Sequence, residues 1–185
     1  MPPRGVDAVI LAGGAGSRTG GLDKGWVHHA GRPLVELALE RLRGEVATVW
    51  ISANRQLARY AALGVPVLAE GLPGAGGPLG GIARALAASG AEWLLSVPVD
   101  APGFPAELVP RLVAAARRHG RACVAAGPER EQPLFAIYPC ALAARAAATV
   151  RAGELAVWRF LRAVEARPVR FDAGGFSNLN TAGLR

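Results

Sequence analysis

The sequence contains little cysteine, almost no lysine and no long apolar run. The two cysteines, Cys123 and Cys140, are too few for a disulfide framework and too far apart for a zinc site. We expect both, like the four tryptophans, to pack in the core. No apolar stretch reaches the roughly 20 residues that cross a bilayer, and no signal-peptide cleavage region follows the first strand. These absences predict a cytoplasmic protein that binds no membrane.

Clustered positive charge is also lacking, although the net charge is +7. The densest basic run, Arg117 to Arg121, lies at a predicted helix end, where positive side chains suit the helix dipole. The other basic residues are scattered, which argues against nucleic-acid binding. A small polyanionic substrate accounts for the charge equally well. Of the 21 basic residues only Lys24 is a lysine, which indicates that a compact ammonium is needed at that position.

The chain of 185 residues, 51% of them hydrophobic, is long enough for one domain with a sizeable core. Short apolar strands alternate with helices, which predicts an α/β fold: a Rossmann-like three-layer sandwich with a mostly parallel sheet and helices on both faces. The predicted strands are 6–11, 46–52, 65–68, 93–97, 122–126, 134–138 and 169–171. The predicted helices begin at Pro33 or span 56–63, 82–88, 105–119, 139–151 and 155–163.

Four informative loops follow predicted strands: 12–25, 53–55, 70–81 and the turn at Asp100. Ligands of such sheets bind beyond the carboxyl ends of the strands. We therefore expect these loops to converge on one edge of the sheet. Their convergence is stronger support for a binding site than any one of the motifs.

The glycine-rich stretch 11–25, LAGGAGSRTGGLDKG, fits neither common phosphate motif. The P-loop places Ser or Thr after its Gly-Lys, and G-x-G-x-x-G requires glycine where Thr19 stands. The backbone N–H groups of this stretch can still form an anion-binding concavity. The side chains of Arg18 and Lys24 can add the positive charge that neutralises a triphosphate. The residues expected to hold the phosphates are Gly13, Gly14, Gly16, Arg18 and Lys24.

Carboxylate and amide side chains follow the other strands. Asp100 ends a buried strand and is well placed to hold Mg²⁺, unless it caps the next helix or forms a turn. Glu70 follows the third strand, or is an exposed loop acid. Asn54 could bind a nucleoside or form a turn, and Asn178 and Asn180, on alternate positions, could read a heterocycle or cap the last turn.

No side chain is a convincing nucleophile, because the serines and cysteines lack an acid or base partner in the sequence. A reaction that needs only positioning and charge neutralisation fits better. Attack of a substrate phosphate on the α-phosphate of a nucleotide is such a reaction.

Together these residues resemble a known family. The pattern L-A-G-G-x(3)-R-x-G-G-x-D-K at 11–24 resembles the signature of the Rossmann-like nucleotidyltransferases, of the nucleotide-diphospho-sugar transferase type. Nearly the whole chain is similar to the molybdenum cofactor guanylyltransferase family. The further matching segments are GRPL at 31–34, ANR at 53–55, GPLGG at 77–81, PVDAP at 98–102 and NLNT at 178–181.

The resemblance implies Mg²⁺-dependent transfer of GMP from GTP to molybdenum-molybdopterin, giving the guanine dinucleotide cofactor and pyrophosphate. It implies catalytic roles for Lys24, Arg18 and Asp100, with the metal on Asp100. Asn178 and Asn180 would face the pterin. The residues implied in GTP binding are Leu11, Ala12, Gly13, Lys24, Asn54, Glu70 and Asp100.

Four features depart from the family pattern. Thr19 stands in place of methionine, Glu70 in place of aspartate, and Val99 in place of a small residue or cysteine. The segment EQPL at 131–134 lies where the family often has His-Pro. Two other functions stay open: a sister enzyme, namely a molybdopterin cytidylyltransferase or a sugar-phosphate or lactyl-phosphate nucleotidyltransferase, and a regulatory protein that binds nucleotides without turnover.

We expect one domain over 1–185, with a GTP-binding half (1–104) and an acceptor-binding half (105–185). We expect a monomer that contacts molybdenum-insertion or molybdoenzyme maturation proteins transiently.

Overall fold

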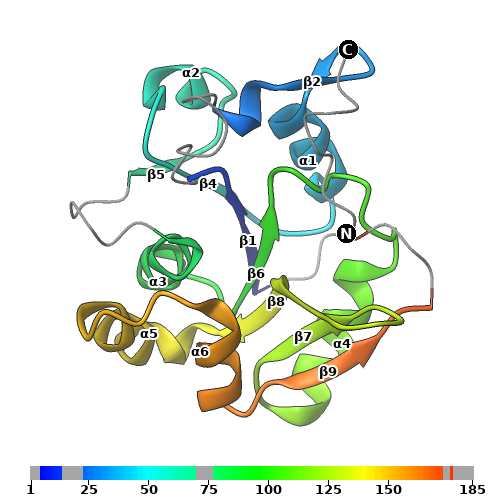
Figure 1. Cartoon of the computed structure of the whole chain (residues 1–185), viewed down its shortest axis with the longest axis vertical. Helices are drawn as coiled ribbons and strands as arrows, with labels where there is room; N and C mark the ends of the chain where they lie inside the picture. Colours follow the sequence, from blue (N-terminus) through cyan, green and yellow to red (C-terminus); the bar gives the residue numbers. More distant parts are fainter. Residues whose placement is uncertain (1–4, 14–22, 70–76, 173–175, 177–185) are drawn as a thin grey trace.

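A seven-stranded sheet in the order β5-β4-β1-β6-β8-β7-β9 forms the centre of the computed structural model (Figure 1). The structure describes residues 5–13, 23–69, 77–172 and 176. The strands of the sheet are β1 (Val6–Leu11), β4 (Val49–Ala53), β5 (Val67–Ala69), β6 (Trp93–Pro98), β7 (Cys123–Ala126), β8 (Glu131–Pro139) and β9 (Arg167–Arg170).

The sheet is mostly parallel, as the alternation of strands and helices predicts. β1 pairs in parallel with β4 and β6, β4 with β5, and β7 with β9. β8 alone among these strands runs the other way, antiparallel to both β6 and β7. The turn between β7 and β8 has room for a hairpin but not for the crossover that a parallel pair needs.

Helices cover both faces of the sheet (Figure 1). One face packs against α1 (Leu34–Leu42), α4 (Leu108–His119) and Tyr60 of the short α2 (Leu57–Ala61). The other packs against α3 (Pro78–Ala88) and α6 (Val157–Ala163), with α5 (Ala143–Arg151) contacting α3. Because both faces are covered, every residue of β1 and β6 is buried, which explains their nearly continuous apolar sequence.

Several element boundaries differ from the sequence prediction. α3 begins at Pro78 and not at 82, because proline suits the first helical position and the two glycines lie inside the helix. At Gly81 a Cβ would come 2.4 Å from Ser52 Oγ, so a glycine lets the helix lie close against the sheet. α4 starts at 108, later than 105, and β9 spans 167–170 in place of 169–171.

Three further features complete the description. A two-stranded ribbon, β2 (His28–His29) with β3 (Arg32–Pro33), was not predicted, since two-residue strands carry no periodic signal. The prediction of a core position is right for Trp93 but wrong for Trp158, which is 47% exposed and carries Arg159 over its ring. Within the part of the chain described, no helix is both long and apolar enough to cross a membrane.

Candidate functional site

The carboxyl ends of β1, β4 and β6 meet at one edge of the sheet, because these neighbouring strands are parallel. The backbone beyond β1 is bound to both neighbours. The N–H groups of Ala12 and Gly13 each donate to the carbonyl of Ser52 at 2.9 Å. The N–H of Val99 donates to the carbonyl of Leu11 at 3.2 Å. The start of the glycine-rich loop is thus anchored at the centre of the edge.

These hydrogen bonds refine the expected phosphate cradle. Since the N–H groups of Ala12 and Gly13 are used by Ser52, free N–H donors for a phosphate would come from residues after Gly13. The positions from which they would come, Gly14 and Gly16, lie outside the described residues. The same holds for the other expected ligand-binding residues Arg18, Glu70, Asn178 and Asn180.

Two of the expected catalytic side chains, Lys24 and Asp100, come together at this edge. Nζ of Lys24 lies 3.0 Å from Oδ2 of Asp100 and donates a hydrogen bond to it. The lysine side chain is 48% exposed and the aspartate side chain 14%. The two residues are 76 positions apart in the sequence, so the fold alone brings this cation and this carboxylate into contact.

Lys24 lies in a tight turn, the 3-10 helix η2 (Lys24–Trp26), which is held at both ends. Asp23 accepts a hydrogen bond from the N–H of Gly25 at 3.1 Å through Oδ1. The same oxygen accepts a 2.5 Å hydrogen bond from the hydroxyl of Tyr60 on α2. On the other side, the guanidinium of Arg59 stacks on Trp26, 3.8 Å from the ring centroid. The turn is therefore docked on α2.

No pattern in the sequence pointed to Tyr60 as a residue of the site. This residue lies in a five-residue helix, and its partner Asp23 is 37 positions away. Burial, followed by the hydrogen bond to Asp23, raises the pKa of the Tyr60 phenol far above its usual range. Gly25 could have indicated that another group packs closely against the turn, because glycine is common where the backbone is closely approached. A Cβ on Gly25 would lie 2.2 Å from the Tyr60 hydroxyl oxygen.

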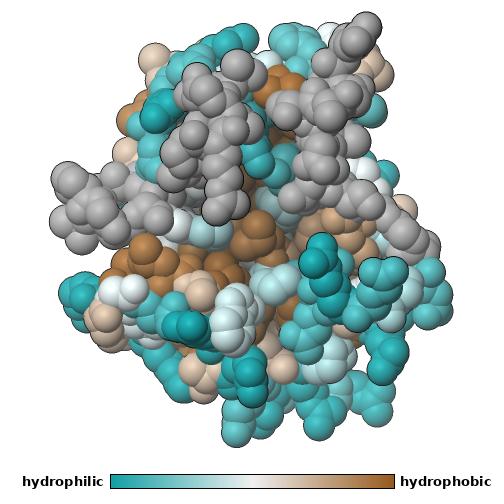
Figure 2. Space-filling view, in the orientation of Figure 1, coloured by the Kyte–Doolittle hydropathy of each residue, from teal (hydrophilic) through white to brown (hydrophobic). Residues whose placement is uncertain are grey.

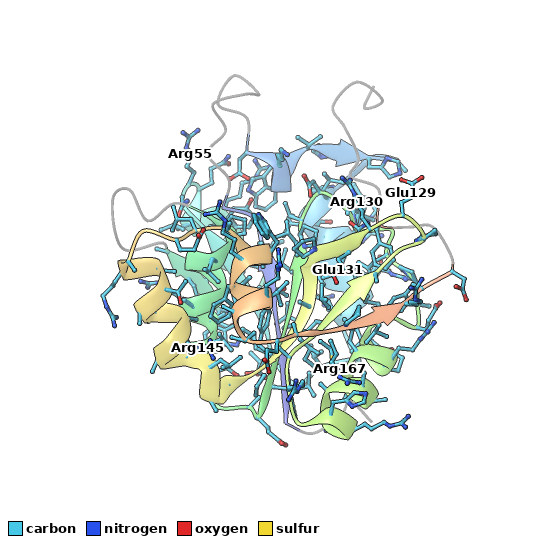
Figure 3. The ribbon with its side chains drawn as sticks, turned by 60° about the horizontal axis from the view of Figure 1, so that its bottom comes forward. Arg55, Glu129, Arg130, Glu131, Arg145 and Arg167 are labelled. Atoms are coloured by element: carbon cyan, nitrogen blue, oxygen red, sulfur yellow. The ribbon has the colours of Figure 1, made fainter. Side chains whose placement is uncertain are left out.

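Asn54 follows β4 at the same edge of the sheet and is exposed. Its neighbour Arg55 extends outward there, whereas Arg145 and Arg167 lie toward the opposite end of the molecule (Figure 3). Gln56, just before α2, has a left-handed backbone with φ of 49°. The chain thus turns sharply between the residue expected to contact the nucleoside and the helix that supports the Lys24 turn.

The residues at this edge fit a metal shared with a substrate. The described residues contain no group of three or more His, Cys, Asp or Glu side chains that could hold a metal ion by themselves. Asp100 offers one largely buried carboxylate, and Mg²⁺ is commonly held by one or two carboxylates together with substrate phosphates and water. Asp100 thus suits a Mg²⁺ ion that arrives with a nucleotide.

The surroundings supply no nucleophile in the described residues. Ser96 is fully buried and donates to the carbonyl of Leu134 at 2.8 Å, so its hydroxyl is structural. Both cysteines are free thiols whose pKa is raised by burial. On the face shown in Figure 2, hydrophobic residues lie across the middle of the molecule, and hydrophilic residues dominate the part below them. The pairing of Lys24 with Asp100 suits binding and charge neutralisation.

Comparison with known proteins places the chain in a family. The model of the MobA-like NTP transferase domain matches residues 8–169. A molybdenum cofactor guanylyltransferase from Serratia proteamaculans is 39% identical over 178 residues, covering 95% of this chain and 90% of that protein. One from Bordetella petrii is 40% identical over 185 residues, covering 95% and 93%.

The fold comparison agrees with the prediction. Molybdopterin-guanine dinucleotide biosynthesis protein A from Archaeoglobus fulgidus superposes with a TM-score of 0.73 at 20% identity, covering 89% of this chain and 83% of that one. The nucleotidyltransferase fold expected from the sequence is confirmed, and so is the resemblance drawn from its motifs. With a matching family model over most of the chain and relatives at this level of identity, the chain belongs to the MobA-like NTP transferases and, among them, to the family of the molybdenum cofactor guanylyltransferases.

Proposed function

We propose that the protein transfers GMP from GTP to molybdenum-molybdopterin, forming the guanine dinucleotide cofactor and pyrophosphate. The observation that carries the proposal is the 3.0 Å contact between Lys24 and Asp100 at the carboxyl edge of the sheet. A nucleotide binds together with a divalent metal ion. The Lys24 ammonium suits its phosphates, and the Asp100 carboxylate suits the metal. The relatives from Serratia proteamaculans and Bordetella petrii are named guanylyltransferases, which supports GTP as the nucleotide.

The reaction requires one bond to form and one to break. An oxygen of the acceptor's terminal phosphate attacks the α-phosphorus of GTP and forms a new P–O–P bridge. The bond from the α-phosphorus to the oxygen bridging to the β-phosphate breaks, and pyrophosphate leaves with the electron pair. Lys24 neutralises charge on the phosphates, an interaction that strengthens as negative charge shifts to the leaving group.

The other residues bind and orient the substrates. In this proposal the glycines after Gly13 supply N–H groups to the phosphates, Arg18 adds a second cation, and Asn54 contacts the nucleoside. Asp100 would hold Mg²⁺, and the ion would supply neutralisation of the phosphate charge. Glu70, Asn178 and Asn180 remain predictions, the last two for the pterin side of the acceptor.

The alternatives differ in ways that an experiment can separate. A cytidylyl sister enzyme would use the same edge of the sheet with a different base. A regulatory protein would bind nucleotide without needing the Asp100 carboxylate for turnover. We also infer a cytoplasmic location, which the two free cysteines support. The monomeric state and the transient contact with molybdenum-insertion or maturation proteins stay predictions.

The first test is calorimetric binding of GTP, CTP, ATP and UTP with Mg²⁺, followed by transfer of label from α-labelled GTP to molybdenum-molybdopterin. We expect selective GTP binding, about tenfold or more weaker in Asp100→Ala because a metal–carboxylate contact is lost. Glu40→Ala is the control, since Glu40 also pairs with a cation, Arg32, at 2.8 Å but is exposed. Preference for CTP would favour the cytidylyl sister, and binding without transfer would favour the regulator.

A further inference from the structure

The turn that carries Lys24 has little support of its own. It has three residues, and its neighbour β2 belongs to a two-stranded ribbon outside the main sheet. A lysine side chain is flexible, and Lys24 is half exposed, so its position depends on where the backbone of the turn is held. The support comes from α2, on the other side of the turn.

The contacts from α2 converge on the residues on both sides of Lys24. The Tyr60 hydroxyl binds Oδ1 of Asp23, the residue before the lysine, at 2.5 Å. The Tyr60 ring packs on Gly25, the residue after it, so closely that a Cβ there would come within 3.1 Å of three ring or hydroxyl atoms. The rings of Trp26 and Tyr60 lie 5.0 Å apart.

We propose that Tyr60 is a positioning residue: by donating to Asp23 and packing on Gly25, it holds the turn where the Lys24 ammonium meets Asp100. The catalytic consequence of this role rests on the proposed function, but the role itself concerns only the placement of Lys24. Nothing in the substrate needs to touch Tyr60, which is fully buried.

The chemistry of the Tyr60–Asp23 contact suits a fixed support. Asp23 uses one oxygen for two donors, the Tyr60 hydroxyl and the Gly25 N–H, so the carboxylate connects α2 with the backbone of the turn. Hydrogen bonds to a charged group are about twice as strong as neutral ones. Burial, followed by this bond, raises the pKa of the Tyr60 phenol, which favours the protonated form that donates to Asp23.

The chain offers a direct test, because Lys24 is its only lysine. Protein grown with isotope-labelled lysine gives one side-chain NMR signal, and this signal reports the surroundings of Lys24 without nucleotide or metal. Asp100→Asn defines where the signal lies when the carboxylate charge is absent. In Tyr60→Phe, which removes the hydroxyl and keeps the ring, we expect the signal to move from its wild-type position toward that of Asp100→Asn.

The second tyrosine provides a matched control. Tyr138 is also fully buried, and its hydroxyl makes no hydrogen bond of good geometry with any of the described residues. It pairs with Leu94 at the amino end of β6, away from Asp100. Tyr138→Phe should leave the lysine signal unchanged. A Lys24 signal that is the same in Tyr60→Phe as in the wild type would overturn the proposal.

Kinetics then separate this proposal from the proposed function. In Tyr60→Phe we expect kcat for GMP transfer to fall about tenfold, the usual cost of a lost hydrogen bond to a charged group, with a smaller change in KM for GTP. Combining it with Asp23→Asn should cost no more than the worse single variant, because both act through one contact. A loss that is fully additive counts against the positioning role.

The two proposals fail in different ways. If the lysine signal moves as expected but the wild type transfers no GMP, the proposed function is refuted and the positioning role stands. If the wild type transfers GMP and the signal does not move in Tyr60→Phe, the positioning role is refuted and the function stands.

Discussion

Lys24 is the single lysine of the chain, whereas the other 20 of its 21 Lys and Arg residues are arginines. Lysine presents a compact ammonium, whereas the planar guanidinium of arginine is broader and binds phosphate as a fork. We expect Lys24→Arg to lower kcat by about tenfold or more, since losing one well-placed donor to developing charge costs about 100-fold. Steady-state transfer assays measure this effect.

The control for this substitution reverses the exchange at an exposed ion pair that does not include Asp100. Arg32→Lys changes an exposed pair with Glu40, and exposed pairs contribute little. It should leave kcat unchanged. Equal rates for Lys24→Arg and wild type would show that charge alone is required at position 24.

Gly25 is a position where even one methyl group is excluded. In Gly25→Ala the new Cβ would meet the Tyr60 hydroxyl oxygen at 2.2 Å, so the turn or the tyrosine must shift. We expect a loss of about 1–3 kcal/mol in the free energy of unfolding, the usual cost of overpacking. Denaturant unfolding measures it, with Gly90→Ala as control, because a Cβ there has no neighbour within 4 Å.

The same geometry predicts a partial rescue. Tyr60→Phe removes the oxygen at 2.2 Å and leaves ring carbons at 3.0 and 3.1 Å, a tight but more tolerable contact. Gly25→Ala should therefore cost less in the Tyr60→Phe background than in the wild type. If the cost is the same in both backgrounds, the hydroxyl is not what excludes the methyl group.

Among the elements, α6 is short and depends on a side chain before its start. Glu154 accepts from the N–H of Ala156 at 2.9 Å through one oxygen and from Arg159 at 2.8 Å through the other. The bond to Arg159, followed by that to the Ala156 N–H, lowers the pKa of the Glu154 carboxyl below its usual value. The folded state thus favours the charged form of Glu154.

The sign of the resulting pH dependence follows directly. Because the folded pKa is the lower one, the stabilisation is present above the unfolded pKa of about 4.3 and is lost as the pH falls through the folded value. Glu154→Gln should lower Tm at pH 7 and have less effect near pH 3. Glu165→Gln is the control, since Glu165 meets Arg121 only at 3.6 Å. A constant difference in Tm across this range would contradict the assignment.

The elements also show how far sequence patterns reach. β1 and β6 were predicted almost to the residue, because strands buried on both faces are continuous apolar runs. The start of α3 was missed because its glycines mimic a loop, whereas one of them, Gly81, lets the helix lie close against Ser52. β8 is longer than predicted because its first residues, from Glu131, are polar and partly exposed. The pattern of apolar residues in the sequence therefore identifies the buried elements, whereas their ends depend on close packing in the folded protein.

At the scale of the whole molecule, the parallel sheet explains why the candidate site could be predicted in part. Lys24 and Asp100 each follow a strand, and parallel neighbours place such residues at a common edge without any detailed model. Tyr60 could not be found in this way. Its role depends on how α2 docks against a turn 37 positions away in the sequence, which no local pattern encodes.

Part of the positive charge behind the net +7 takes part in contacts within the protein. Several arginines donate to backbone carbonyls or stack on aromatic rings. Arg41 binds the carbonyl of Phe104, Arg111 that of Arg170 and Arg145 that of Ala163. Arginine is well suited to such contacts because it combines several donors with a planar face. These arginines stabilise the fold, and the basic composition is no argument for nucleic-acid binding.

Because one edge of the sheet carries the proposed site, a ligand there should stabilise the whole sheet. GTP with Mg²⁺ would bridge residues that follow β1, β4 and β6, three adjacent strands of one sheet. A ligand at about 100 times its Kd adds about 2.7 kcal/mol, which for a chain of this length raises Tm by about 5–10 °C. Thermal unfolding with and without nucleotide measures the shift, and Asp100→Ala should abolish the part that depends on Mg²⁺. A shift as large with CTP as with GTP would count against guanine selectivity, and no shift with any nucleotide would count against a nucleotide site at this edge.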